Sequence, residues 1–157
     1  MILILMGVAG CGKSTIGRAL AQRLKVELIE GDELHPPSNV SKMREGSALT
    51  DEDRWPWLRA IAQRVDSILE HGGRAVVTCS ALKQSYRDIL ARPGVQFVYL
   101  RVSPEVARAR LATRTGHFFP PALLQSQFDT LQEPREALTV NGEQGVEPTV
   151  SEIVARA

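Results

Sequence analysis

The sequence predicts an α/β fold in which helices wrap a parallel sheet. Short apolar runs alternate with helical stretches along the 157 residues, which is typical of such folds. Nearly all of these runs are continuously apolar rather than alternating, as expected for strands buried on both faces. The chain has no repeats, low-complexity tracts or linkers. Its length suits one domain over residues 1–157 that can bury a core without disulfides or metals.

Five strands are expected from the apolar runs. They cover residues 2–6, 26–29, 75–78 and 96–100, with a weaker candidate at 137–140. Helices are expected at residues 13–24, 56–71, 83–90, 104–112, 121–131 and 149–155. Because proline is not tolerated deep inside a helix, Pro56 predicts that the residues just before it form a turn leading into the second helix.

Composition and charge restrict the class of function. The formal net charge is +1, so bulk charge does not argue for a nucleic acid or membrane partner. Two cysteines, Cys11 and Cys79, are too few for a disulfide framework and favour a reducing compartment. The apolar run at residues 1–6 is too short to span a bilayer and lacks the charged start of a signal peptide, so a cytoplasmic protein is expected.

Residues 7–14 match the pattern G-x-x-x-x-G-K-[ST] directly after an expected strand and at the start of an expected helix. In this context Lys13 reaches the outer phosphates of a nucleotide, and the Ser14 hydroxyl takes one Mg²⁺ position. The alternative, a chance glycine-rich turn, is disfavoured because the full pattern is rare. The predicted nucleotide-binding residues are Gly7, Val8, Ala9, Gly10, Cys11, Gly12, Lys13, Ser14 and Thr15. Cys11 could be a redox switch, but a small side chain in a crowded turn is the favoured interpretation.

Asp32 follows the second expected strand, at the edge where open α/β sheets bind ligands. A carboxylate there can accept a hydrogen bond from an acceptor hydroxyl and aim it at the γ-phosphate. It can also take the proton late, as a general base. The alternative is a turn or cap residue, because aspartate is common in turns. We predict the catalytic role for Asp32.

Residues 31–55 interrupt the alternation of strands and helices and are rich in polar side chains, which is typical of binding loops. The candidate acceptor-binding residues in this insert are His35, Asn39, Lys42 and Arg54. Their mixture suits a ligand with an anionic group and several hydroxyls, although a solvated loop would also explain any single cation. Lys83 and Arg87, four residues apart on an expected helix, could bind the anionic group. Arg87 could equally pair with a nearby carboxylate.

A second interruption, over about residues 110–121, is predicted to be a lid. Arg110 and Arg114 share a helical face at its start. Such a segment can close over ATP, and its arginines can neutralise charge on the transferring phosphoryl group. Catalytic roles are therefore predicted for both arginines, with Arg110 also contacting the nucleotide. Ordinary solvated charges are the alternative.

Several strings along the chain are distinctive: residues 6–14, 31–36, 39–43, 49–58, 79–83 with 86–88, 116–119 and 127–134. Together they resemble gluconate kinases. Shikimate and nucleoside monophosphate kinases share the phosphate loop but not the strings on the acceptor side. The resemblance covers the chain from the first strand to about Pro134.

The resemblance implies that ATP and D-gluconate react with Mg²⁺ to give ADP and 6-phosphogluconate, often in a homodimer. It also implies an adenylate-kinase-like core, with three α/β/α layers and a five-stranded parallel sheet of order 2-3-1-4-5. It adds Ala81, His117 and Gln132 to the expected substrate-binding residues. Glu30 stands where the family commonly has aspartate, and Cys11 stands where it commonly has serine.

Two other readings stay open. The first is a kinase for another small hydroxy acid or for a nucleotide, although the sequence shows no clear pocket for an acceptor base. The second is a nucleotide-dependent switch or binding protein. A GTPase switch would need a guanine-specifying Asn-Lys-x-Asp string, and the sequence contains none.

Overall fold

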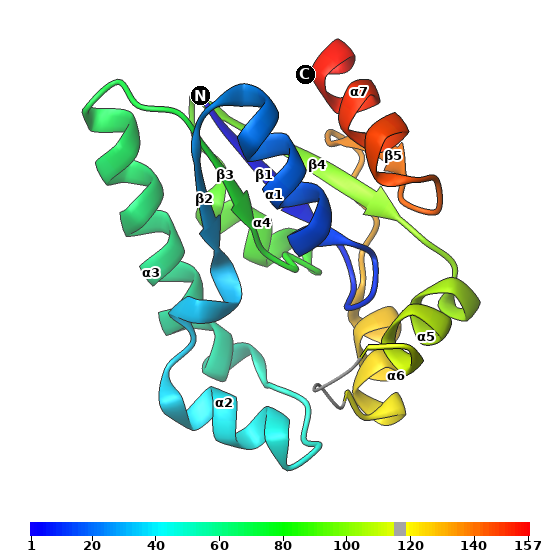
Figure 1. The fold of residues 1–157 in the computed structure, drawn as a ribbon. Helices are drawn as coiled ribbons and strands as arrows, with labels where there is room; N and C mark the ends of the chain where they lie inside the picture. The colour runs from blue at the N-terminus through cyan, green and yellow to red at the C-terminus, as the bar shows by residue number, and fades with distance from the viewer. Residues whose placement is uncertain (115–118) are drawn as a thin grey trace.

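The computed structural model describes residues 1–114 and 119–157, and these contain one parallel sheet of five strands. The strands are β1 (Ile2–Met6), β2 (Glu27–Glu30), β3 (Ala75–Thr78), β4 (Val95–Arg101) and β5 (Leu138–Asn141). Their order is β2-β3-β1-β4-β5, and all neighbouring pairs run parallel, as the resemblance implied (Figure 1). β1 and β3 have the predicted bounds, and the ends of the other three differ by one residue.

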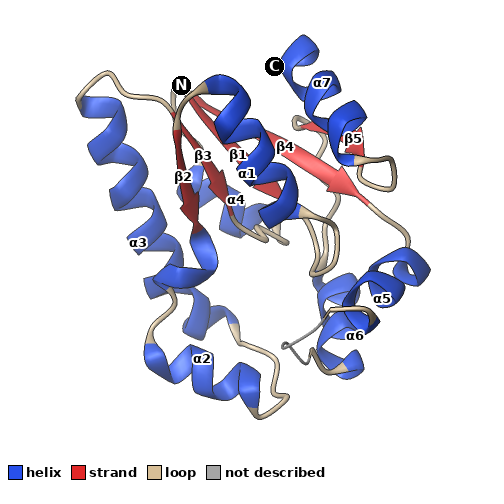
Figure 2. Cartoon of the chain, viewed as in Figure 1, coloured by secondary structure: helices blue, strands red, loops and turns tan. Residues whose placement is uncertain are grey.

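Helices cover both faces of the sheet and complete the expected three-layer arrangement. The helices of the described residues are α1 (Lys13–Leu24), α2 (Pro37–Arg44), α3 (Asp51–Glu70), α4 (Gln84–Leu90), α5 (Pro104–Ala112), α6 (Pro121–Thr130) and α7 (Val146–Arg156), with a short 3₁₀ helix η1 (Gly31–Leu34). α1 packs beside α7 on one face, whereas α4 lies on the opposite face in contact with α3 (Figure 2). α2, α5 and α6 lie beyond the carboxyl ends of the strands (Figure 1). Among the described residues, no helix combines the length and apolar character that a membrane span requires.

The central strands β1 and β3 form the middle of the core. Every residue in both strands is buried, because helices cover both faces of the sheet. At the carboxyl ends, Leu5 pairs with Thr78, and Thr78 pairs with Glu30 of the next strand. The segments that follow β1, β2 and β3 therefore leave the sheet side by side, at the edge where open α/β sheets bind ligands.

α3 begins earlier than predicted, so that Pro56 lies inside the helix rather than before it. Thr50 and Asp53 form a capping box, in which each side chain accepts a hydrogen bond from the backbone N–H of the other. A proline inside a helix ordinarily costs about 3 kcal/mol. The cap and the burial of Trp57 just beyond the proline offset that cost. The predicted turn is therefore wrong, because tertiary contacts and the cap outweigh a local penalty.

The insert at residues 31–55 is also more regular than the sequence predicts. η1 continues directly from β2, and α2 starts with Pro37 as its first residue, where the missing N–H of proline has no helical partner to lose. Neither element was predicted, because eight residues or fewer give too short a window for a periodic apolar pattern. Both elements lie at the ligand-binding edge of the sheet.

Candidate active site

The phosphate loop joins β1 to α1 in the conformation that its glycines allow. Gly7 and Gly10 have φ angles of 144° and 81°, a region that other residues rarely adopt. A Cβ at Gly10 would lie 2.7 Å from the carbonyl oxygen of Ala107, so α5 leaves no room for a side chain there. Lys13 Nζ donates to the carbonyl oxygens of Gly7 (2.9 Å) and Val8 (3.0 Å). The lysine therefore lies across the inside of the loop that the motif predicts.

Ser14 lies at the position where the motif predicts a metal. Its Oγ donates to Oε2 of Glu30 at 3.0 Å, and the hydroxyl of Thr78 donates to the same oxygen at 2.7 Å. The longer glutamate side chain thus still reaches the phosphate loop from the end of β2. Hydroxyl and carboxylate oxygens are the hard donors that Mg²⁺ prefers. Within residues 1–114 and 119–157, no group of three or more His, Cys, Asp or Glu side chains could hold a metal ion.

The other side chains of the phosphate loop mostly face inward. Val8 and Cys11 are buried, whereas Thr15 is exposed in the first turn of α1. The burial of Cys11 fits the interpretation of a small side chain in a crowded turn. Cys79, after β3, is buried as well, and desolvation raises the pKa of its thiol to about 12, so it is not a thiolate at neutral pH.

Arg110 braces the phosphate loop from outside. Its guanidinium donates to the carbonyl oxygens of Gly10 (3.3 Å), Cys11 (3.2 Å) and Gly142 (2.7 Å). These contacts tie α5 to the loop and to the segment that follows β5. A nucleotide contact stays a prediction for Arg110. Contact with the transferring phosphoryl group likewise stays a prediction.

Arg114 has a different environment, because its exposed side chain lines the cleft that contains Lys13. The expected lid continues through residues 115–118, which include His117 and lie outside the described residues. The lid and the substrate role of His117 therefore stay predictions.

Gln127 is a contact of the phosphate loop that was not predicted. Its Oε1, on α6, accepts a hydrogen bond of 2.7 Å from the backbone N–H of Ala9. That N–H belongs to the loop that is expected to surround the phosphates. The string at residues 127–134 resembles the gluconate kinase family, but nothing in it indicates a contact 118 residues away.

A cleft joins the phosphate loop to the acceptor side of the molecule. Lys13 and Ser14 line it from the loop, and Asp32, His35 and Arg54 line it from the insert. Asp32 is exposed in η1, directly after β2, which is the position that the sequence predicts. The structure therefore brings Asp32, which is predicted to orient the acceptor hydroxyl, into the same cleft as Lys13, which is predicted to bind the phosphates.

His35 lines this cleft as part of a stacked aromatic pair. Its ring lies 4.0 Å from that of Trp57, at an angle of 14°. Trp57 is buried, and its Nε1 donates to the carbonyl oxygen of Gly31 at 2.8 Å. Burial lowers the pKa of His35 from 6.5 to about 4, so the imidazole is neutral at neutral pH.

Asn39 and Lys42 contact α3 instead of lining the cleft. Asn39 Nδ2 donates to the carbonyl oxygen of Asp53 at 2.8 Å, and Lys42 Nζ pairs with the Asp53 carboxylate at 2.6 Å. The hydrogen bond from Lys42 lowers the pKa of the Asp53 carboxyl to about 2. Both residues therefore bridge α2 to the first turn of α3. Direct contact with the substrate stays a prediction for them.

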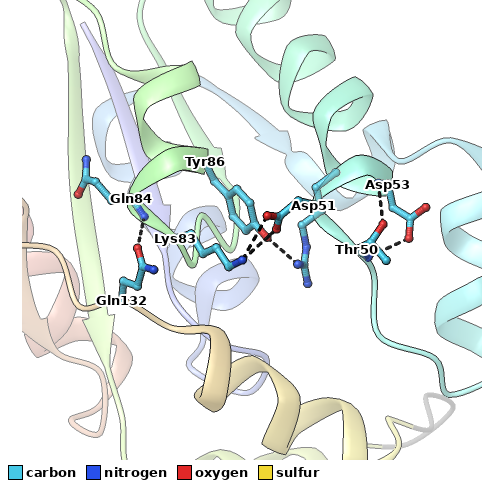
Figure 3. A network of polar contacts seen from close by, with 8 residues as sticks. Thr50, Asp51, Asp53, Lys83, Gln84, Tyr86 and Gln132 are labelled. Atoms are coloured by element: carbon cyan, nitrogen blue, oxygen red, sulfur yellow. Dashed lines mark hydrogen bonds and ion pairs between the residues drawn. The ribbon is translucent and has the colours of Figure 1, made fainter.

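Arg54 lines the cleft and is held by a polar network. Tyr86, Asp51 and Lys83 of this network are shown in Figure 3. Arg54 Nη1 donates to the hydroxyl of Tyr86 at 2.7 Å, and that hydroxyl donates to the carboxylate of Asp51. Lys83 Nζ donates to the same carboxylate at 3.0 Å. Burial, together with the bond to Asp51, raises the pKa of Tyr86 to about 12, and the hydroxyl in turn lowers the pKa of Asp51. The charge of Lys83 is thus paired with that of Asp51, whereas the charged side chain of Arg54 lines the cleft.

Arg87 does not reach the cleft. It is 3% exposed, and its guanidinium donates to three backbone carbonyls and one side-chain oxygen. These acceptors are Ala81 O (2.7 Å), Leu82 O (3.1 Å), Gln132 O (2.7 Å) and Gln84 Oε1 (3.2 Å). Among residues 1–114 and 119–157, no carboxylate forms an ion pair with Arg87, and its predicted role in binding an anion stays a prediction. Two of the carbonyls lie in the turn before α4, and the third, Gln132 O, lies in the segment after α6, so the guanidinium ties these two segments together.

Ala81 and Gln132 lie beside Arg87 rather than in the cleft. Ala81 is fully buried with a φ of 45°. Gln132 Oε1 accepts a hydrogen bond of 2.9 Å from the backbone N–H of Gln84, at the start of α4 (Figure 3). The positions support the turn that carries Lys83. Their substrate-binding role stays a prediction.

Known proteins resemble this chain over most of its length. The family model for shikimate kinase matches residues 9–140. The thermosensitive gluconokinase of Escherichia coli (strain K12) is 45% identical over 84% of this chain and 72% of its own length. The thermoresistant gluconokinase of the same organism is 39% identical over 98% and 91% of the two chains. The crystal structure of a gluconokinase from Sinorhizobium meliloti 1021 has a TM-score of 0.88 and 47% identity, and the match covers 98% of this chain and 89% of that one.

These similarities extend well beyond the phosphate loop. They span both the nucleotide side of the cleft and the insert that supplies Asp32, His35 and Arg54. The chain is a kinase of the P-loop type, and within the group that the shikimate kinase model describes it belongs to the gluconokinase family.

Proposed function

We propose that this protein transfers the γ-phosphoryl group of ATP to D-gluconate, giving ADP and 6-phosphogluconate. The observation that carries the proposal is the shared cleft, in which Lys13 and Ser14 face Asp32, His35 and Arg54. A phosphate-binding loop and an acceptor site must lie within one cleft for direct transfer. The names of the gluconokinase relatives support gluconate as the acceptor.

Asp32 orients the acceptor hydroxyl in this mechanism. Its carboxylate accepts the hydroxyl hydrogen bond and directs the oxygen toward the γ-phosphate. Because the transition state of phosphoryl transfer is loose, the proton needs to leave only late, and Asp32 takes it as a general base. Lys13 exchanges its two loop carbonyls for phosphate oxygens and so neutralises charge on the transferring group.

Arg54 binds the carboxylate of gluconate. Its guanidinium is half-buried, lines the cleft and is fixed by the Tyr86 hydroxyl. A planar guanidinium matches a carboxylate with two parallel hydrogen bonds. Lys83, the cation expected from the sequence, has its charge paired with Asp51 and supports Arg54 from behind. The insert at residues 31–55 is thus an acceptor-binding segment.

Ser14 and Glu30 would hold Mg²⁺ together with the phosphates of ATP, because their oxygens already converge beside the loop. The ion supplies charge neutralisation on the phosphate oxygens. The homodimer implied by the family is part of the same proposal. Light scattering during size-exclusion chromatography tests it, and a mass near 17.3 kDa would show a monomer instead.

A coupled assay of ADP release tests the acceptor. Gluconate, other sugar acids, shikimate and nucleoside monophosphates are compared at equal ATP concentration. We expect gluconate to have the highest kcat/KM. A nucleoside monophosphate that performs better would overturn the choice of acceptor and leave the kinase activity standing.

A further inference from the structure

The two ring nitrogens of His35 lie in different environments. Nδ1 lies 3.2 Å from Nδ2 of Asn39. Nε2 makes no hydrogen bond with residues 1–114 or 119–157, and the ring lines the cleft. One nitrogen is therefore engaged by the protein, and the other is available to a ligand.

The side-chain amide of Asn39 decides which nitrogen carries the proton. Its Nδ2 also lies 2.8 Å from the backbone carbonyl oxygen of Asp53, which can only accept a hydrogen bond. The NH₂ group must therefore face that carbonyl, and its second hydrogen points to Nδ1 of His35. Nδ1 is then the acceptor, so the proton of the neutral ring is on Nε2.

Asn39 and its partners are firmly held. Asn39 is 3% exposed, so a reversed amide would bury two facing acceptor oxygens without a hydrogen bond between them. Asp53 is fixed by the capping box with Thr50 and by its ion pair with Lys42. The stacked ring of Trp57 restricts the imidazole from one face.

The surrounding charges leave the ring of His35 neutral. Asp32 favours the protonated form of His35, whereas Arg54 opposes it, and burial opposes it more strongly than either. A proton on Nδ1 would point at the amide hydrogen of Asn39. Burial is also the main reason that the pKa of His35 is lowered to about 4.

We propose that His35 acts as a neutral Nε2–H donor to a hydroxyl of the acceptor, and that Asn39 is the positioning residue that fixes this tautomer. The first part rests on the proposed gluconate site. Asp32 accepts from one hydroxyl while His35 donates to the oxygen of another, so η1 and the residue that follows it present one acceptor and one donor. A polyol can satisfy both groups, since a hydroxyl donates and accepts.

Nuclear magnetic resonance tests the tautomer without any assumption about the acceptor. Long-range ¹H–¹⁵N spectra of the ¹⁵N-labelled full chain resolve its three imidazoles, and a His35→Gln variant identifies the signals of His35. We expect a protonated Nε2 and a bare Nδ1 from pH 5.5 to pH 8. An Nδ1–H tautomer, or a midpoint of protonation between pH 6 and pH 7, would overturn the assignment.

The positioning role is tested with Asn39→Ala, which removes the amide and leaves both tautomers accessible. We expect the ¹⁵N shifts of His35 to move toward the average of the two forms, and the KM for gluconate to rise with little change in the KM for ATP. Unchanged ¹⁵N shifts in a folded variant would remove Asn39 from the proposal. If the variant does not fold, the spectrum of the parent still decides the tautomer.

Kinetics of His35 variants test the donor. His35→Ala should raise the KM for gluconate about fivefold, the usual effect of one lost hydrogen bond, whereas His35→Gln keeps an N–H donor and should retain most of the affinity. Equal KM values for Ala, Gln and parent would reject the donor role. If the parent itself does not phosphorylate gluconate, the proposed function fails, and the spectra still test the tautomer independently.

Discussion

The two sides of the cleft are built from different parts of the chain. On the phosphate side, Lys13 bonds to carbonyls only five and six positions away, within one loop. On the acceptor side, Arg54 depends on Tyr86, 32 positions away, and His35 depends on an amide that is itself held by another helix. The phosphate side therefore relies mainly on the backbone conformation of one loop, with Gln127 and Arg110 as outer supports, and the acceptor side relies on packed side chains. We expect damage to the first to abolish turnover and damage to the second to weaken acceptor binding.

The largest effect is expected for Lys13→Ala. The ammonium neutralises charge on the transferring group, and loss of one such electrostatic contact typically costs about 10²–10³-fold or more in kcat. Lys13 is only half-buried, so the variant should remain folded. Turnover is measured by ADP release, and folding is measured by circular dichroism. Parental activity in a folded variant would contradict the assignment of the phosphate loop.

Asp32→Asn should lower kcat for gluconate by at least about 100-fold, because loss of a general base typically costs about 10²–10⁴-fold. Binding of Mg·ATP should change little, since separate groups hold the nucleotide. Asn is a good turn residue, so it also tests the alternative that Asp32 only shapes the turn after β2. A kcat close to that of the parent would show that the carboxylate has no part in the reaction.

Alanine variants of the two lid arginines should differ in their effects. Arg114→Ala should reduce kcat about tenfold. A full arginine finger contributes about 10³–10⁵-fold, and we expect a smaller effect here because the side chain of Arg114 is exposed. Arg110→Ala removes three bonds to backbone carbonyls and should lower the melting temperature and weaken ATP binding. Identical behaviour of the two variants would contradict the distinction drawn from their contacts. If both variants turn over like the parent, neither arginine acts on the transferring phosphoryl group.

Tyr86→Phe is a smaller change that tests the polar network around Arg54. It removes the hydroxyl that holds Arg54 while keeping the buried ring, so the KM for gluconate should rise a few-fold, about the effect of one hydrogen bond worth ~1 kcal/mol. Arg54→Ala serves as the comparison and should have a larger effect on the same constant. A rise in the KM for ATP instead would mean that the network serves the nucleotide.

The smallest effect concerns stability against pH. His35 has a pKa of about 4 in the folded protein and about 6.5 when unfolded, so the unfolded chain binds more protons between these values. This residue's contribution to the free energy of unfolding is therefore complete above about pH 6.5 and is lost as the pH falls toward 4. Urea unfolding at pH 7 and pH 5 should show a smaller decrease for His35→Gln than for the parent. Equal decreases would mean that His35 titrates normally.

The sequence alone predicts the phosphate side well, and the physical reason is locality. The pattern at residues 7–14 specifies its own loop conformation, and the apolar runs around it specify buried parallel strands. Asp32 was predicted at the cleft for a related reason, since it directly follows a strand whose carboxyl end faces the ligand edge. The sheet order was implied by the family resemblance rather than by any local pattern.

Tertiary structure alone decided which polar side chains face the cleft. Arg87 is buried against backbone carbonyls, and Lys83 is neutralised by Asp51. Gln127 reaches the phosphate loop from α6. A cation in a sequence carries no sign of whether a carbonyl, a carboxylate or a ligand will satisfy it, because that partner comes from a segment distant along the chain. The fold brings those segments together, and only then does each charge acquire a function.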